Sequence, residues 1–336
     1  MRVCARASPS LALMKYWGKR EGGINLPATP SLALTLGGLE TTTLVEPAQG
    51  DSDIVVVDGI ERDSARYAPF FAEVRKRLRS RLHFQAESRN SFPGGSGFAS
   101  SSSGFAALAL ATARLVQELE ERAEPSLDLL SELARVGSAS AARAVLGGFT
   151  QLPAGSPRAE AFLPAEHWPE FRVVAAIVAR GEKPLSSRAA MEATRETSPY
   201  YNEWIIDAPR LVTKAKDALE SRDLPRLGAL ARLSYSRMHA SALAADPPLL
   251  YWLPESVALI RACASLRAAG IGAWETMDAG PQVKVLCLAG DLEAVLAGLS
   301  AAVGKLECLV ARPGPAPEVF IHEEGLAFPS HRLPPA

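Results

Sequence analysis

The sequence predicts an α+β protein with two domains. Its 336 residues are more than twice the roughly 150 residues of a typical domain. The first third alternates short apolar runs with turns, which indicates several antiparallel strands ahead of the first long helix. The chain then becomes mainly helical and later shows a β-turn-β-α-β pattern. We expect domains at 1–180 and 181–325 and a tail at 326–336, with the division near Arg180.

In the first domain, apolar and β-branched runs between turn residues predict the strands, and Asp58-Gly59 marks the turn after the third run. Pro125-Ser126 supplies a helix N-cap, and Gly147-Gly148 stops a later helical start. Residues 153–169 are loop-like. The predicted elements, in order, are strands at 31–36, 41–45 and 53–57, a helix at 65–80, a strand at 83–87, helices at 104–121 and 127–136, a helical start at 138 and a strand at 172–179.

In the second domain, apolar residues at i, i+3 and i+4 over 205–219 place one stripe on a long helix. The predicted elements that follow are helices at 225–243 and 255–269, a strand at 271–277, a turn at 278–281, a strand at 282–288, a helix at 292–303 and a strand at 306–311. The last of these have the order of a ferredoxin-like half. We expect the Pro-rich segment from Pro313 to be an ordered edge that fades into disorder.

Composition and charge exclude several classes of protein. With 48% apolar and 22% charged residues, the chain is neither disordered nor fibrous. The net charge of −1 gives no overall field for nucleic acid or an acidic membrane, so an anionic ligand must meet local charges. We interpret the basic run 75–81 as a largely solvated helix face with one or two arginines turned toward a site.

The cysteines and histidines indicate a reducing compartment and no structural metal. Four cysteines without a C-x-x-C pattern lie in apolar segments, which favours buried free thiols over a disulfide framework. The five histidines show no i, i+4 pair, so we expect no metal site built from protein ligands alone. The apolar patch 11–14 is too short for a signal peptide, and the uncharged run 91–113 is too rich in Ser and Gly to span a membrane. We therefore expect a cytoplasmic protein.

The segment Asn90–Gly104 reads N-S-F-P-G-G-S-G-F-A-S-S-S-S-G and opens a helix. Free backbone N–H groups, small side chains and the positive end of a helix together favour phosphate binding. The segment has neither G-x-x-x-x-G-K-[ST] nor the G-x-G-x-x-G spacing of a dinucleotide fold. The alternative is a flexible surface loop, although such loops rarely lead directly into a strongly apolar helix.

Three charged residues have the chemistry of phosphoryl transfer and carboxylate binding. Asp278, in a turn beside glycine, can orient a hydroxyl or accept its proton during attack on a γ-phosphate, although it also suits an Asx turn. Lys15, near an aromatic pair, can neutralise charge between that hydroxyl, Asp278 and the phosphoryl group, or lie exposed at a strand end. Arg143 follows two serines and can bind a carboxylate with two N–H groups, or lie on a helix surface. Val145 and Leu146 indicate that this helix is buried.

Five motifs together resemble the diphosphomevalonate decarboxylase family, and they occur in the family's order between Ala7 and Val310. That family belongs to the galactokinase, homoserine kinase, mevalonate kinase and phosphomevalonate kinase (GHMP) superfamily. The motifs are L-M-K-Y-W-G-K-R at 13–20, F-P-G-G-S-G-F-A-S-S at 92–101, G-S-A-S-A-A-R at 137–143, Ser186-Ser187-Arg188 with Glu196-Thr197-Ser198-Pro199, and M-D-A-G-P at 277–281. The first and last are specific to the decarboxylases, whereas the Gly/Ser loop marks only the superfamily.

The resemblance implies a two-domain GHMP-kinase-like fold, with an N-terminal domain like domain 2 of ribosomal protein S5 and a ferredoxin-like C-terminal domain. It implies an ATP site in the Gly/Ser loop, a substrate site between the domains, and a homodimer. The family phosphorylates the tertiary hydroxyl of mevalonate 5-diphosphate with ATP and Mg²⁺, then releases phosphate and CO₂ to give isopentenyl diphosphate for isoprenoid biosynthesis. No nucleic acid and no membrane partner is expected.

Carried over residue by residue, the resemblance implies catalytic roles for Asp278, Lys15 and Arg143. Ser138 and Ser140 would hydrogen-bond the hydroxyl and carboxylate region of the substrate, and Ser101 is a possible Mg²⁺ contact beside the ATP phosphates. The implied substrate-binding residues are Tyr16, Trp17, Lys19, Arg75, Ser138, Ser140, Ser187 and Arg188. The implied ATP-binding residues are Asn90, on the adenine side, and Pro93, Gly94, Gly95, Ser96, Gly97, Ser100 and Ser101.

The sequence departs from the family pattern at two places. The loop reads P-G-G-S-G-F where P-T-A-A-G-L is usual, and Ala142 replaces a common cysteine. The extra glycine favours a more mobile loop and weaker ATP binding, but no charged group is lost. Two alternatives remain open: a decarboxylase of mevalonate 5-phosphate or a mevalonate 3-kinase, and a non-catalytic nucleotide-binding relative. An intact Asp278 and phosphate loop argue against the last of these.

Overall fold

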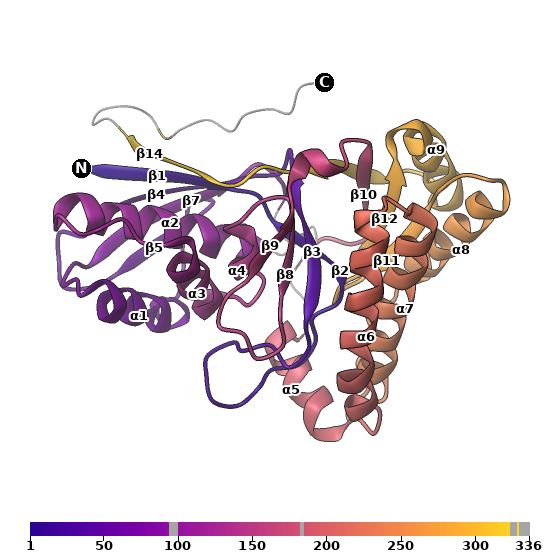
Figure 1. Ribbon diagram of the computed structural model, residues 1–336, viewed down its shortest axis with the longest axis horizontal. Helices are drawn as coiled ribbons and strands as arrows, with labels where there is room; N and C mark the ends of the chain where they lie inside the picture. The colour runs from indigo at the N-terminus through magenta and orange to yellow at the C-terminus, as the bar shows by residue number, and fades with distance from the viewer. Residues whose placement is uncertain (94–99, 182–184, 323–327, 329–336) are drawn as a thin grey trace.

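Two β-sheets lie side by side along the long axis of the molecule, each with its own helices (Figure 1). The computed structural model describes residues 1–93, 100–181, 185–322 and 328. Within these residues, one sheet has six strands and the other eight. No helix in the described part of the chain combines the length and the apolarity that crossing a membrane requires. Three of the four unpaired cysteines are buried, as predicted, and Cys308 is half-buried.

The six-stranded sheet contains the earliest and the latest strands of the described chain. Its order is β14 (Glu318–His322), β1 (Arg2–Ala7), β4 (Thr41–Pro47), β7 (Phe84–Asn90), β5 (Ile54–Val57) and β6 (Ile60–Glu61). The strands before the first helix pair antiparallel with one another, as predicted, whereas β7, which follows that helix, is parallel to β5. A helical crossover, η1 (Ser64–Arg66) with α1 (Ala68–Leu78), joins these strands, and such a crossover returns the chain in the same direction.

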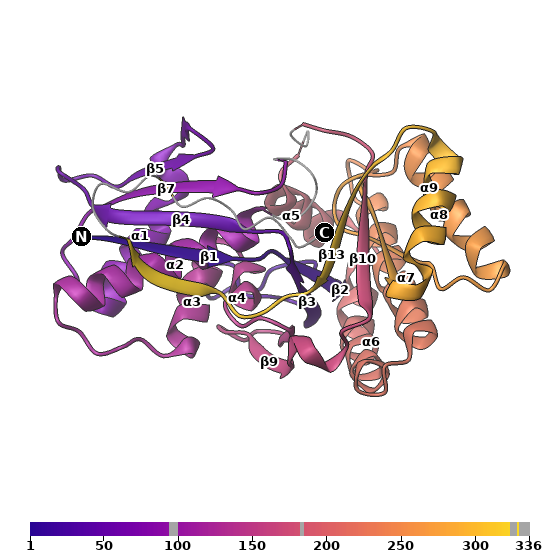
Figure 2. The same cartoon turned by 90° about the horizontal axis from the view of Figure 1, so that it is seen from above.

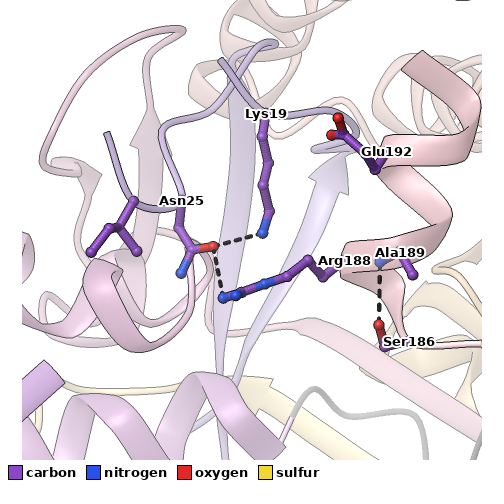
Figure 3. A pocket seen from close by; sticks show the side chains of 7 residues that line it. Lys19, Asn25, Ser186, Arg188, Ala189 and Glu192 are labelled. Carbon is purple, nitrogen blue, oxygen red and sulfur yellow. Dashed lines mark hydrogen bonds between the residues drawn. The ribbon is translucent and has the colours of Figure 1, made fainter. Parts of the chain in front are cut away.

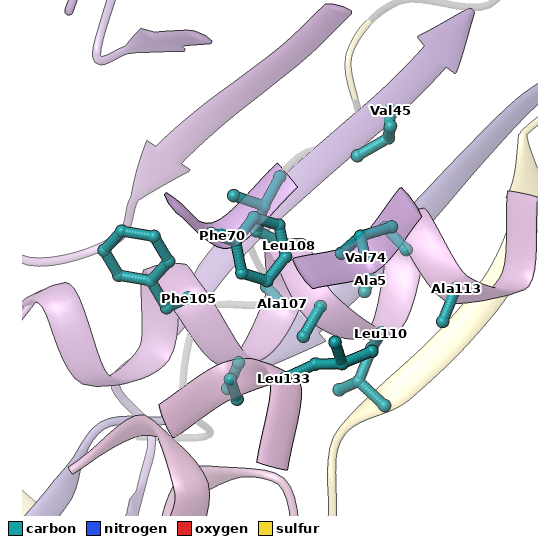
Figure 4. Packing of buried hydrophobic residues seen from close by; sticks show 14 of the residues in the cluster. Ala5, Val45, Phe70, Val74, Phe105, Ala107, Leu108, Leu110, Ala113 and Leu133 are labelled. Carbon is teal, nitrogen blue, oxygen red and sulfur yellow. The ribbon is translucent and has the colours of Figure 1, made fainter. Parts of the chain in front are cut away.

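Helices cover one face of this sheet and form the N-terminal core with it. The helices are α1, α2 (Ser100–Leu119), α3 (Leu127–Gly137) and the short α4 (Ala141–Ala144). Figure 4 shows side chains from α1, α2 and α3 meeting over the strands. Members of the N-terminal core include Val3, Ala5, Val45, Phe70, Val74, Phe84, Phe105, Leu108, Leu115 and Leu133. In the first turn of α2, Ser102 and Ser103 are buried and Ser103 Oγ lies 2.6 Å from Thr41 Oγ1 of β4, so the start of this helix is held against the sheet.

The eight-stranded sheet combines strands from both predicted domains. Its order is β11 (Trp274–Met277), β12 (Val283–Leu288), β10 (Phe171–Ile177), β13 (Glu307–Pro313), β3 (Ser31–Gly37), β8 (Phe149–Leu152) and β9 (Glu160–Leu163), with β2 (Ser10–Met14) paired to β3. The division near Arg180 falls after β10, which pairs with β12 and β13. Both predicted domains therefore contribute to this sheet, and the division itself stays a prediction.

Two helical layers enclose β10. The layers consist of α6 (Tyr201–Glu220) and α7 (Leu224–Leu243), and of α8 (Pro254–Ala268) and α9 (Leu292–Val303). The helix α5 (Ser187–Thr197) packs against α6 and α7 in a separate cluster, and η2 (Ala165–His167) and η3 (Ala289–Asp291) are short turns. Val173 and Ala175 share a core with α6 and α7, whereas Val174 and Ala176 share one with α8 and α9. Alternate side chains thus enter different layers, so β10 is apolar along its whole length. Figure 2 shows that α8 and α9 lie at the end of the molecule away from the six-stranded sheet.

Several predicted boundaries shift, and some strands were not predicted at all. The helix predicted from 104 begins at Ser100, and the helical start at 138 is the short α4. The loop prediction for 153–169 is wrong over β9, whose four residues alternate too little to signal a strand. β1 and β2 were not predicted. The segment after Pro313 is an ordered edge, as predicted, because β14 pairs with β1; residues 323–327 and 329–336 lie outside the description.

Candidate active site

Lys15 and Asp278, predicted to act together, are in direct contact. Lys15 follows β2, and its backbone N–H donates to Ser234 Oγ of α7 at 2.8 Å. Its Nζ donates to Asp278 Oδ1 and to the Ala12 carbonyl oxygen, both at 2.7 Å. The Lys15 side chain is 1% exposed and that of Asp278 is 33% exposed. The carboxylate therefore has one face on a buried cation and another toward solvent.

A second lysine, not predicted from the sequence, lies on the other carboxylate oxygen. Lys284 on β12 is buried, and its Nζ lies 3.3 Å from Asp278 Oδ2. Burial acts to raise the pKa of Asp278, but Lys15 and Lys284 together lower it well below its usual range. Burial also lowers the pKa of Lys15, an effect that Asp278 opposes. The carboxylate is therefore ionised across the physiological pH range.

Arg143 is buried at the start of the short helix α4. Its side chain donates from Nε to Ser10 Oγ at 3.2 Å and from Nη1 to Ser31 Oγ. The residue is 2% exposed, so the alternative of a helix-surface arginine is wrong. Among the described residues, no Asp or Glu forms an ion pair with it. Burial lowers its pKa to about 10, against the opposing field of Asp278. A buried guanidinium without a carboxylate partner is costly unless an anion binds there.

The predicted ATP and substrate serines lie close together. Ser138 Oγ and Ser140 Oγ are 3.1 Å apart, and Ser101 Oγ is 3.4 Å from Ser138 Oγ. Ser102 Oγ of α2 donates to the Ser140 carbonyl oxygen at 3.0 Å. The N-terminus of α2 is thereby joined to the turn that precedes Arg143.

A cavity of about 540 Å³ lies beside Lys19 and Arg188 (Figure 3). Both cations donate to Asn25 Oδ1, from Lys19 Nζ at 2.7 Å and from Arg188 Nη2 at 3.3 Å. Asn25 in turn donates from Nδ2 to the carbonyl oxygens of Arg135 and Val136, at 3.2 and 2.8 Å, which fixes its amide orientation. Burial and Arg188 lower the pKa of Lys19 to about 8, while Glu192 opposes this shift. Two cations thus converge on one neutral oxygen.

Three further residues that were predicted to bind substrate have different surroundings: Tyr16, Trp17 and Ser187. The Tyr16 hydroxyl is buried and has no hydrogen-bond partner among the described residues, and burial raises its pKa. Trp17 is 2% exposed in an apolar cluster with Trp204 and Met238, and its buried Nε1 has no hydrogen-bond partner among the described residues, so its substrate contact stays a prediction. Ser187 is the first residue of α5 and directly precedes Arg188.

Arg75 does not lie with the other predicted substrate cations. Its guanidinium binds both oxygens of Asp53 at 2.9 Å, which ties α1 to the start of β5. No described contact joins it to Lys19 or Arg188, so we leave it out of the proposed site. The sequence prediction placed it by an approximate alignment of a variable helix, and helix residues only one position apart face different directions.

The predicted phosphate loop is described only at its two ends. Asn90, the last residue of β7, donates from Nδ2 to Asp58 Oδ2 at 2.8 Å and accepts from Thr41 Oγ1 at 2.7 Å. Pro93 and Ser100 are the described residues on either side of 94–99. Gly94, Gly95, Ser96 and Gly97 lie outside the described residues.

Comparison with known proteins places these motifs in one family. The model described as the diphosphomevalonate decarboxylase-like N-terminal domain matches residues 7–163, and that of the mevalonate 5-diphosphate decarboxylase C-terminal domain matches residues 173–312. The diphosphomevalonate decarboxylase of Candida albicans is 32% identical over 303 residues, or 83% of this chain and 82% of the relative. The chain belongs to the diphosphomevalonate decarboxylase family.

Solved structures of this family have the same fold. The mevalonate diphosphate decarboxylase of Enterococcus faecalis is 35% identical, with a TM-score of 0.86 over 95% of this chain and 99% of that one. The enzyme of Staphylococcus aureus is 29% identical, with a TM-score of 0.89 over 95% and 98%. The predicted two-domain α+β GHMP-kinase-like fold is confirmed, and the chain is an enzyme of the diphosphomevalonate decarboxylase type.

Sequence reasoning missed Lys284 and Asn25 as members of this decarboxylase site. Lys284 carries a signal, because a lysine inside a strand buried on both faces needs a charged partner. Asn25 carries no such signal, because its role depends on Lys19 and Arg188 meeting at its amide oxygen in the fold. Within the described ranges, no group of three or more His, Cys, Asp or Glu side chains is arranged to hold a metal ion.

Proposed function

We propose that this enzyme catalyses the ATP-dependent decarboxylation of mevalonate 5-diphosphate to isopentenyl diphosphate, with release of ADP, phosphate and CO₂. The observation that carries the proposal is the position of the Asp278 carboxylate, which lies between two buried lysines while part of its surface is exposed. A solved structure 36% identical to this chain, with a TM-score of 0.87, is described as MDDEF in complex with MVAPP, AMPPCP and magnesium.

In this proposal Asp278 accepts a hydrogen bond from the tertiary hydroxyl of the substrate and orients its oxygen for attack on the γ-phosphate of ATP. A carboxylate with a strongly lowered pKa is a weak base, so it takes the proton only as the phosphoryl group transfers. Lys15 then neutralises charge that develops beside the attacking oxygen. Departure of the new phosphate group and loss of CO₂ complete the reaction.

Arg143 suits the substrate carboxylate. Its guanidinium is buried, oriented by Ser10 and Ser31, and has no ion-pair partner in the described chain. A carboxylate bound there gains two charge-assisted hydrogen bonds and satisfies the buried cation at the same time. Ser138 and Ser140 precede Arg143 and are proposed to hydrogen-bond the same region of the substrate.

Lys19 and Arg188 are proposed to bind the diphosphate group. Both donate to Asn25 Oδ1, and both line the cavity of about 540 Å³. A neutral amide oxygen compensates two positive charges poorly, which favours a polyanion in the cavity. Tyr16, whose buried hydroxyl has no partner in the described residues, and Ser187 are proposed to contribute further hydrogen bonds.

ATP is proposed to bind at the start of α2, with Ser100 and Ser101 near its phosphates, Asn90 on the adenine side and Pro93 beside the nucleotide. The first N–H groups of a helix have no intrahelical partner and attract phosphate oxygens. The Ser101 hydroxyl lies 3.4 Å from that of Ser138, so these oxygens suit a hard cation carried by a nucleotide. Mg²⁺ bound there with ATP would supply neutralisation of phosphate charge.

The test is a coupled assay of phosphate and CO₂ release with mevalonate 5-diphosphate and mevalonate 5-phosphate side by side. We expect the diphosphate to be preferred by about 10²-fold or more in kcat/KM, since each charge-assisted contact contributes roughly 1.5–3 kcal/mol. Equal turnover of both substrates would replace the proposal with a monophosphate decarboxylase. Phosphorylation without CO₂ release would replace it with a 3-kinase, and no ATP turnover would favour a non-catalytic relative.

We also propose that the enzyme is a cytoplasmic homodimer. The dimer is inferred from the family resemblance. The location is inferred from the four cysteines, which form no disulfide and therefore suit a reducing compartment. Light scattering coupled to gel filtration tests the dimer, with a monomer mass of 35.7 kDa as the contrary result. Fractionation of cells that express the protein tests the location.

A further inference from the structure

The backbone of Asp278 is bound by a histidine that the proposed reaction does not use. His239 on α7 has its Nε2 3.1 Å from the Asp278 carbonyl oxygen, and Trp252 donates from Nε1 to His239 Nδ1 at 2.6 Å. A carbonyl oxygen only accepts, so Nε2 must carry a proton. An indole N–H only donates, so Nδ1 must be unprotonated. The two contacts together select one neutral tautomer.

The surroundings of His239 favour the same neutral form. The residue is 6% exposed, and the rings of Tyr235 and Tyr251 meet it edge to face at centroid distances of 5.8 and 5.6 Å. Burial lowers its pKa to about 4, with a further contribution from Lys15, while the hydrogen bond to Asp278 opposes the shift. A proton on Nδ1 would also point at the Trp252 N–H. The imidazole therefore remains a fixed donor.

Asp278 needs such a donor because it lies just outside the β-ladder. The last paired residue of β11 is Met277, opposite Val283 of β12, so the following carbonyl has no strand partner. Lys15 and Lys284 contact only the carboxylate, and long lysine side chains can follow a carboxylate that moves. His239, fixed on a helix that packs against β11, ties the main chain of Asp278 to rigid structure.

We propose that Trp252 and His239 form a positioning relay, which fixes the backbone of Asp278 and so directs its carboxylate toward the reacting hydroxyl. The inference rests on the proposed function, because it takes Asp278 as the group that contacts that hydroxyl. His239 is in this view a positioning residue, with no contact to the substrate of its own.

The first test compares kcat and KM for His239→Leu and His239→Gln. Misplacement of a reacting group by about 1 Å costs about 10²-fold in rate, so we expect His239→Leu to lower kcat about 10- to 100-fold. KM for the diphosphate should change less than about twofold, because Lys19 and Arg188 are untouched. Glutamine can donate from nearly the position of Nε2 and should restore kcat to within about threefold of wild type.

The control is His167→Leu, which removes a bond of the same kind elsewhere. His167 Nε2 lies 3.0 Å from the Leu219 carbonyl oxygen, and among the described residues it makes no contact with Asp278. We expect its kcat and KM to match wild type. Thermal unfolding of all variants separates lost stability from lost positioning.

The second test reads the tautomer directly, by ¹⁵N NMR of the full-length enzyme labelled at histidine. The His239 signals, assigned by their loss in His239→Gln, should show a protonated Nε2 and a bare Nδ1 between pH 6 and about 8. Trp252→Phe removes the donor to Nδ1, so this variant should show mixed tautomers and a kcat lower by about three- to tenfold.

Three results would overturn the relay: a folded His239→Leu variant with wild-type kcat, a loss greater than about tenfold in His239→Gln, or a wild-type His239 protonated at Nδ1. If His239→Leu does not fold, the glutamine variant and Trp252→Phe decide the question. Failure of the proposed function is seen separately, as a wild-type enzyme that releases no CO₂ from mevalonate 5-diphosphate while the NMR signature is still read.

Discussion

Asp278 holds its negative charge between two buried lysines, and replacement by asparagine tests that charge with little change in volume. We expect Asp278→Asn to lower kcat by about 10³-fold or more, because the amide can neither accept the hydroxyl proton nor compensate Lys15. Binding of the diphosphate, measured by calorimetry, should change little. If the variant keeps more than about a tenth of the wild-type kcat, the activation barrier has risen by less than about 1.4 kcal/mol. Asp278 would then be only a turn residue.

Lys284 is expected to set the acidic limit of the reaction. Lys15 and Lys284 lower the pKa of Asp278 despite its burial, so the wild-type carboxylate protonates only well below its usual range. Lys284→Met removes one of these cations, so the pKa of Asp278 should rise. Activity that depends on the ionised form should then be lost at a higher pH as acid is added.

The measurement for Lys284 is kcat/KM against pH from about 3 to about 9, a range that includes the ordinary titration of an aspartate. The acidic limb of Lys284→Met should move to higher pH, and Lys305→Met, which removes an exposed lysine, should leave the profile unchanged. Superimposable profiles for Lys284→Met and wild type would show that Lys15 alone sets the ionisation of Asp278.

Lys19 is expected to set the basic limit of diphosphate binding. Its pKa is lowered to about 8 in the free enzyme, so it loses its proton, and with it an anion contact, as the pH rises through that value. kcat/KM, which reports the free enzyme, should fall above about pH 8. Lys19→Arg should move this limb upward, since guanidinium stays charged. Lys214→Arg on the exposed face of α6 is the control and should leave the pH profile unchanged. If kcat/KM of Lys19→Arg still falls above about pH 8, another group is responsible for the loss.

Among the elements, α2 and α3 are packed so closely that one added methyl group disturbs them. A Cβ at Gly137, the last residue of α3, would lie 1.9 Å from Cδ1 of the buried Phe105. We expect Gly137→Ala to destabilise the protein by about 1–3 kcal/mol, as overpacking does. Urea unfolding measures this loss. Gly104→Ala on α2, where an added Cβ meets nothing within 4 Å, should leave the free energy of unfolding unchanged or raise it slightly. Equal losses of stability in both variants would mean that the contact with Phe105 is not the cause.

The elements that the sequence predicted well are those whose signal is local. The apolar stripe over 205–219 gives α6, and the β-turn-β-α-β order of the later chain matches β11, β12, α9 and β13. The five residues of β2 are all buried and show no alternation, so the run is equally compatible with a helix segment. The parallel pairing of β5 with β7 depends on contacts far apart in sequence, which no local pattern contains.

The candidate site was predictable where motif residues carry their own charge. Lys15 and Asp278 were predicted as a pair and lie in contact, and Arg143 is buried as its apolar neighbours indicate. Asn25 was not predicted, because its role depends on two cations, Lys19 and Arg188, which lie far apart in the sequence and both donate to its side-chain oxygen. Trp17 was assigned by its motif and Arg75 by an approximate alignment, and neither the apolar cluster around Trp17 nor the ion pair of Arg75 with Asp53 could be predicted from the sequence.

At the scale of the whole molecule, the two halves are expected to unfold together. The eight-stranded sheet contains strands from both sides of position 180, and β14 returns to pair with β1. Within the described chain, the N-terminal core contains no tryptophan. The five tryptophans, which report on the rest of the molecule, are Trp17, Trp168, Trp204, Trp252 and Trp274.

The test is urea unfolding followed by tryptophan fluorescence and by far-UV circular dichroism. Because circular dichroism reports on both halves, coincident midpoints would mean one cooperative transition. We expect coincidence, since loss of either half exposes strand edges of the other. A circular dichroism curve with a second step that fluorescence does not follow would show that the N-terminal core unfolds by itself.

The pairing of β1 with β14 has a consequence for synthesis on the ribosome. β1 is made long before β14, the strand that covers its outer edge, because the two strands lie at opposite ends of the order of elements. Until then β1 presents unpaired N–H and C=O groups, which are a template for pairing with a wrong strand or with a neighbouring nascent chain. Completion of the six-stranded sheet therefore waits for the synthesis of β14, and chaperones that shield strand edges during translation should raise the yield of active enzyme.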